Sequence, residues 1–67
     1  MTDIEMLRAT IERKGVKLRK VCEALEISEP TLRRKMTGKA EFQQGEIVKL
    51  RDFLSLTDDE VLRIFLL

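Results

Sequence analysis

Histidine, tyrosine and tryptophan are missing from this 67-residue chain, and cysteine occurs once, at Cys22. A single thiol forms no disulfide within the chain, and without histidine it leaves no ligand set for a structural metal ion. A nucleophile–base pair is equally hard to assemble from the residues that remain, because such pairs usually use histidine. We therefore expect a protein that is not an enzyme, that needs no metal or other cofactor, and that takes no small-molecule substrate.

Long apolar runs are missing as well. The longest one, Ile64 to Leu67, has four residues, whereas a membrane-spanning helix needs about 20. The first residues, MTDIEMLRAT, begin with acidic and polar side chains and lack the layout of a signal peptide. These features predict a cytoplasmic protein without a membrane partner. A chain of this length predicts one domain, residues 1–67.

Strand signals are scarce, since no run of β-branched residues alternates with polar ones. Apolar residues recur at helical spacing instead, and capping residues divide the chain into short segments. We predict an all-α fold, a compact bundle of about five short helices. They cover residues 2–15, 18–26, 29–37, 44–56 and 57–67.

Two details of these helices are specific enough to be checked. Thr2 and Glu5 have the spacing of a capping box at the start of the first helix. In the fourth helix, Phe53 is predicted to share the inward face. The other members of that face are Ile47, Leu50 and Leu54.

A very short joint connects the second and third helices: Glu26, Ile27 and Ser28. Ser28 is a good N-cap for the third helix, and Gly38 is a left-handed stop at its end. Two short amphipathic helices with such a joint form a helix-turn-helix, in which we expect Ile27 to fill the gap between them.

The charges are strongly segregated along the chain. Residues 13–39 carry nine bases and three acids, a net charge of +6, whereas residues 1–12 carry −2 and residues 40–67 carry −3. An isolated charged helix face is usually only solvated. A basic segment between two acidic ones, on a helix-turn-helix, instead favours a nucleic-acid surface.

The third helix divides into two faces. Leu32 and Met36 form its inward stripe, and Arg34 points outward between Pro30 and Thr37. The planar fork of arginine matches the O6 and N7 acceptors of guanine in the major groove. This pattern indicates a helix that reads DNA bases.

The segment LRKVCEALEISEPTLRRKMTGKAEF resembles the helix-turn-helix of phage repressor and Cro proteins, the lambda-repressor-like (XRE) family. The matching positions are Val21, Cys22, Leu25, Ile27, Ser28, Thr31, Leu32 and Gly38. The resemblance continues through a fourth and fifth helix and so covers nearly the whole chain. Two positions depart from the family pattern: Leu18 replaces a frequent glutamine, and Glu26 replaces a glycine in the turn.

The resemblance implies a role for each matching position. The base-reading residues would be Glu29, Pro30, Arg33, Arg34 and Thr37. The phosphate contacts would be Lys17, Arg19, Lys20, Thr31, Lys35 and Lys39, with Lys17 or Arg19 in place of the glutamine contact. Cys22 would be a small core residue packed between the two helices.

The predicted function is a sequence-specific double-stranded DNA-binding transcriptional regulator. It would be Cro-like or repressor-like, of phage or mobile-element type, and associated with a bacterial nucleoid. The helix at 29–37 would enter the major groove, and a homodimer would bind a two-fold site. The predicted dimer interface is Val61, Leu62, Ile64, Phe65, Leu66 and Leu67.

Two alternatives remain open at this point. Some of the apolar C-terminal residues would simply cover the core instead of forming an interface. The domain would also suit a protein-interaction module that binds a repressor or a polymerase subunit. Glu29, the missing glutamine and the low overall charge favour that module.

Overall fold

The computed structural model describes residues 1–66, so Leu67 lies outside the described residues. Within residues 1–66, five helices follow one another without a strand. They are α1 (Ile4–Arg13), α2 (Leu18–Leu25), α3 (Glu29–Met36), α4 (Gln44–Leu54) and α5 (Asp58–Phe65). The predicted all-α fold is confirmed, with helices up to two residues shorter at each end than expected.

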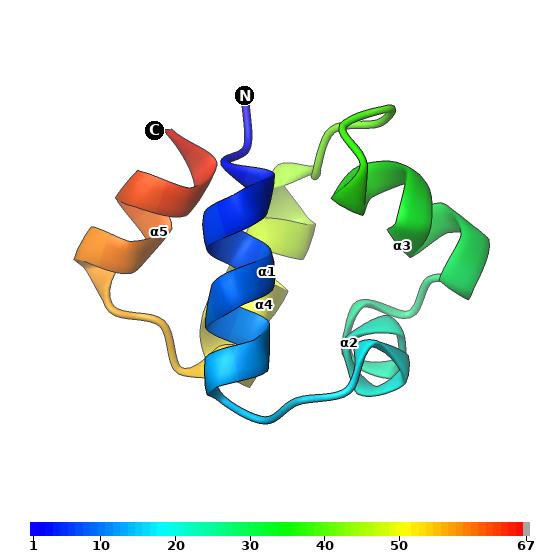
Figure 1. The fold of residues 1–67 in the computed structure, drawn as a ribbon, viewed down its shortest axis with the longest axis horizontal. Helices are drawn as coiled ribbons and strands as arrows, with labels where there is room; N and C mark the ends of the chain where they lie inside the picture. The colour runs from blue at the N-terminus through cyan, green and yellow to red at the C-terminus, as the bar shows by residue number, and fades with distance from the viewer. Residues whose placement is uncertain (67) are drawn as a thin grey trace.

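The helices form two groups around α1 (Figure 1). On one side, α2 packs against α3 and α4; on the other, α5 packs against α1 and α4. The chain ends meet, because the N–H of Asp3 donates to the carbonyl of Ile64 at 2.6 Å. Helices α3 and α5 lie at opposite ends of the molecule (Figure 1).

One apolar core joins all five helices. Leu7, Val21, Leu50 and Ile64, from α1, α2, α4 and α5, are fully buried, and α3 contributes its inward stripe. Phe42, in the loop before α4, meets Phe65 edge-to-face with ring centroids 5.8 Å apart. The remaining core residues are Ile11, Cys22, Leu25, Leu32, Met36, Leu54 and Leu56. No helix within residues 1–66 is long and apolar enough to cross a membrane.

The helix caps correct one prediction. Asp3, and not Thr2, caps α1: its carboxylate accepts from the N–H of Met6 at 3.0 Å. A carboxylate one residue later competes well with a hydroxyl for the free N–H groups. At α5 a capping box forms, since Thr57 and Glu60 exchange hydrogen bonds of 3.1 and 2.9 Å.

The cap of α5 also changes the acidity of its glutamate. The N–H of Thr57, and then the guanidinium of Arg13 at 2.9 Å, lower the pKa of Glu60 because both favour the carboxylate. A lowered folded-state pKa means that this stabilisation is present above the ordinary pKa of the carboxyl group. It is lost as the pH falls through the lowered value.

The expected inward position of Phe53 was wrong, because 42% of its surface is exposed. Successive residues of a helix are about 100° apart, which places Phe53 beside the face that Leu50 and Leu54 bury. Ile47, and not Phe53, packs against the core together with Leu50 and Leu54.

Glu26 ends α2 in the left-handed conformation, with φ of 58°. We expect Glu26→Gly to raise the free energy of unfolding by on the order of 1 kcal/mol, because the Cβ strain is removed. The lost ion pair to Lys49, at 3.2 Å, is solvent-exposed and contributes little. Urea denaturation measures the change.

Glu23→Gly, inside the same helix, is the control for this substitution. There a glycine should lower stability, since it adds backbone entropy to the unfolded chain without relieving strain. A loss of stability for Glu26→Gly comparable to that of Glu23→Gly would contradict the strain argument.

Candidate nucleic-acid interface

Helix α3 is held in place by the residues at its two ends and by its buried inner face. The hydroxyl of Ser28 accepts from the N–H of Thr31 at 3.3 Å and donates to the hydroxyl of Thr31 at 2.8 Å. Gly38 adopts φ of 81° after the last turn. Leu32 and Met36 are buried against the core. The direction of the outer face is therefore set by packing on one side and by caps at both ends.

The joint before α3 has the geometry that the sequence predicts. Glu26 reverses the chain, and the N–H of Ile27 donates to the carbonyl of Cys22 at 3.1 Å. Ile27 is half-buried and packs against the core. The inward packing expected of Ile27 at this joint is observed, and its filling of the gap between α2 and α3 stays a prediction.

The five predicted base-reading residues form the outer face of α3. All of them are exposed: Glu29, Pro30, Arg33, Arg34 and Thr37. The hydroxyl of Thr37 points at the carbonyls of Arg33 and Arg34, at 3.0 and 3.2 Å. Because its proton is used at the helix end, Thr37 presents its methyl group and an acceptor oxygen to a ligand.

Four of the predicted phosphate contacts are exposed. Lys17, Arg19 and Lys20 surround the start of α2, and Lys39 follows α3. No side chain caps the start of α2, so the N–H groups of its first turn have no side-chain acceptor, and such a helix start can bind an anion. Thr31 is partly buried, and its hydroxyl is occupied by Ser28.

Lys35 is removed from the predicted phosphate set, because its side chain is only 8% exposed. Its ammonium lies 2.9 Å from the Oε1 of Glu46 and 2.9 Å from the carbonyl of Glu41. The ring of Phe42 lies beneath it, 5.8 Å away at the centroid. The loop after α3 folds back over this side of the helix, so Lys35 fixes α3 to α4 from inside.

A protein-family model described as a helix-turn-helix domain matches residues 5–64. The chain belongs to the helix-turn-helix domain family. The match covers all five helices apart from the first residue of α1 and the last of α5. No curated protein and no solved structure matches the chain significantly.

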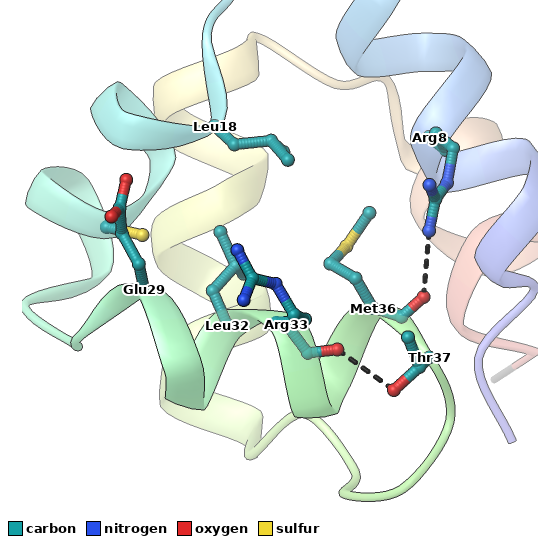
Figure 2. A pocket seen from close by; sticks show the side chains of 8 residues that line it. Arg8, Leu18, Glu29, Leu32, Arg33, Met36 and Thr37 are labelled. Atoms are coloured by element: carbon teal, nitrogen blue, oxygen red, sulfur yellow. Dashed lines mark hydrogen bonds between the residues drawn. The ribbon is translucent and has the colours of Figure 1, made fainter.

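One residue of this helix-turn-helix domain, Arg8, was missed by the sequence reasoning. Its guanidinium donates from α1 to the carbonyl of Met36 at 3.1 Å and so closes the end of α3 (Figure 2). The two residues are 28 positions apart in the sequence, and Arg8 is the one basic residue within residues 1–12. No local pattern in the sequence signals this contact.

A hollow of about 320 Å³ opens between α1, α2 and α3 of the domain (Figure 2). Its walls are apolar and its rim is charged. The lining residues are Arg8, Leu18, Cys22, Glu29, Leu32, Arg33, Met36 and Thr37. Burial, and next the nearby carboxylate of Glu29, raise the pKa of the Cys22 thiol. The thiol thus stays protonated, which matches the core role expected for it.

The C-terminal helix divides the predicted interface residues. Leu62 and Leu66 are 51% and 57% exposed, and Val61 is partly buried. Ile64 and Phe65 are buried in the domain's own core, so they are removed from the predicted interface. The prediction for Leu67 lies outside the described residues. Val48 of α4 is exposed as well, beside a hollow of about 380 Å³ that reaches Val61.

Proposed function

We propose that this helix-turn-helix domain is a sequence-specific regulator of transcription that inserts α3 into the major groove of double-stranded DNA. The observation that carries the proposal is the exposed pair Arg33 and Arg34 on a helix fixed by its caps and its buried face. An α-helix fits the major groove, and arginine recognises guanine there through two hydrogen bonds. The resemblance of the sequence supports a Cro-like or repressor-like protein of phage or mobile-element type.

Charge fixes the orientation of the domain on the duplex. The exposed bases Lys17, Arg19, Lys20 and Lys39 flank α3 and neutralise phosphates on either side of the groove. The acidic first turn of α5, with Asp58, Asp59 and Glu60, lies at the opposite end of the molecule (Figure 1). A polyanion therefore approaches the α2–α3 end and is repelled from the α5 end.

Selection of bound sequences from a random duplex pool tests this function. The proposal predicts an enriched motif with two-fold symmetry that contains guanine in each half, since Arg34 is the main base reader. If the protein binds the duplex pool without enriching any motif, it binds DNA but does not recognise a sequence. Absence of duplex binding at low salt, even at tens of micromolar protein, would contradict the proposal.

The second candidate function, a module that binds a repressor or a polymerase subunit, is favoured by one specific observation. Leu18, the first residue of α2, and Glu29, the first residue of α3, are both exposed. An apolar side chain suits a protein partner, and the carboxylate of Glu29 repels phosphates. Glu29 nonetheless has a role in a DNA reader, because a carboxylate accepts a hydrogen bond from the N4 amino group of cytosine. Binding that persists at high salt would favour the protein module.

Two copies would pair through α5 in this proposal. Leu62 and Leu66 are exposed apolar residues at α5, and Val48 is exposed on α4, which packs against α5. Helix α3 lies at the far end of each copy (Figure 1). A molecule 28 Å long that pairs through one end carries two recognition helices far enough apart for half-sites about 34 Å apart.

Leu62→Glu tests the pairing. We expect the substitution to lower affinity for the two-fold site by about tenfold or more, because the second copy no longer adds to binding, and to leave half-site affinity unchanged. Fluorescence anisotropy on full and half sites measures both. Phe53→Glu, at an exposed apolar position outside the proposed pairing surface, is the control. Equal losses on full and half sites would contradict pairing through α5.

A further inference from the structure

Leu18 is an exposed leucine at the entrance of the hollow between α1, α2 and α3. It is the first residue of α2 and is 48% exposed. Its side chain points toward Leu32 and Met36 across the hollow (Figure 2). Both of these residues belong to the core, so the apolar walls of the hollow continue outward to the surface at Leu18.

The hollow borders the proposed base-reading face directly. Glu29 and Arg33 lie on successive turns of α3, Thr37 caps its C-terminal end, and all three line one side of the hollow. The same three residues are exposed members of the base-reading face. A base edge that meets this side of α3 therefore also covers the mouth of the hollow. Two bases, Arg8 and Arg33, outnumber the one acid, Glu29, among the lining residues, and the resulting positive charge suits a polyanion.

We propose that Leu18 and the apolar wall of this hollow bind the C5-methyl group of a thymine. Leucine offers no hydrogen bond, and the C5-methyl is the apolar group that base pairs present in the major groove. A methyl group fits easily within about 320 Å³. Leu18 thus makes α2 a reader of sequence beside Arg33, which lines the same hollow.

This inference rests on the proposed function, and its experiment separates the two. Each thymine of the selected duplex is replaced in turn by deoxyuridine, which lacks only the methyl group. Affinity is measured for the wild type, for Leu18→Ala and for Phe53→Ala, an exposed apolar control on α4.

One thymine in each half-site is expected to be sensitive. Deoxyuridine there should weaken wild-type and Phe53→Ala binding by about fourfold, the effect of one methyl group leaving an apolar contact. Leu18→Ala should bind the two duplexes equally. A second comparison replaces that thymine by cytosine in one duplex and by 5-methylcytosine in another, so that the two duplexes differ only in the methyl group. The wild type should bind the 5-methylcytosine duplex about fourfold more tightly than the cytosine duplex.

Two results would overturn the inference while the proposed function stands. One is a wild type that binds every deoxyuridine duplex as tightly as the parent. The other is a sensitive thymine whose effect persists in Leu18→Ala. Failure of the wild type to bind the parent duplex would overturn the proposed function, and this inference with it, before any base is replaced.

Discussion

Lys35→Met is expected to lower the free energy of unfolding by about 3 kcal/mol, the loss typical when one partner of a buried ion pair is removed. Methionine keeps the apolar stem of the lysine but leaves the carboxylate of Glu46 without its ammonium, which lies 2.9 Å away. The carbonyl of Glu41 loses its donor in the same step. For a domain of this size, 3 kcal/mol is a large part of the total stability. Thermal and urea unfolding measure the change.

The double substitution Lys35→Met with Glu46→Gln isolates the pair. Glutamine keeps an oxygen for the N–H of Gln43, which donates to Glu46 at 2.7 Å, but it removes the uncompensated charge. The double variant should therefore be more stable than the sum of the two single losses predicts. Duplex affinity, measured well below the melting temperature, should be unchanged. A stable Lys35→Met protein with weakened duplex binding would return Lys35 to the phosphate contacts.

Arg34→Ala is expected to lower discrimination at one base pair of the site by about 10- to 100-fold, or about 1–3 kcal/mol. Arg34 is exposed on the outer face of α3, so the substitution should leave the free energy of unfolding within about 0.5 kcal/mol of the wild type. Competition between duplexes that differ at each position measures the effect. Only the pair that Arg34 reads should lose its preference.

Arg63→Ala is the matched control for this measurement. Arg63 is an exposed arginine on α5, paired with Asp59 at 2.9 Å, and it lies at the end of the domain away from α3. Its removal should not alter base preference. If Arg34→Ala weakened binding to all sequences equally, Arg34 would be a phosphate contact and not a base reader.

The helix-turn-helix itself could be predicted from the sequence because its signals are local. The cap at Ser28, the three-residue joint and the stop at Gly38 each depend on a residue and its near neighbours. The exposed outer face of α3 follows from the same information, since Leu32 and Met36 define the buried side. Local signals of this kind specify helix ends and faces without knowledge of the tertiary structure.

Two features of the site depend on the tertiary structure and could not be predicted. The spacing of Lys35 places it at the side of α3, but the neighbour on that side is Glu46, brought there by the loop between α3 and α4. Arg8 reaches the end of α3 only because α1 packs beside it. Helical periodicity gives the direction of a side chain and not the element that it meets.

The C-terminal helix shows the same limit. VLRIFLL is apolar on most of its circumference, so its sequence does not distinguish an inward face from an interface. The structure separates them: Ile64 and Phe65 enter the core, and Leu62 and Leu66 remain outside. The buried half follows from packing of α5 on α1 and α4.

Salt titration of the selected duplex tests the central claim most directly. The exposed bases Lys17, Arg19, Lys20 and Lys39 should each neutralise a phosphate, so log affinity should fall linearly with log salt, with a slope of about −3 to −4 per copy. Lys39→Ala should reduce that slope by about one. Affinity that is independent of salt, or no duplex binding at low salt, would contradict the assignment of this surface to DNA.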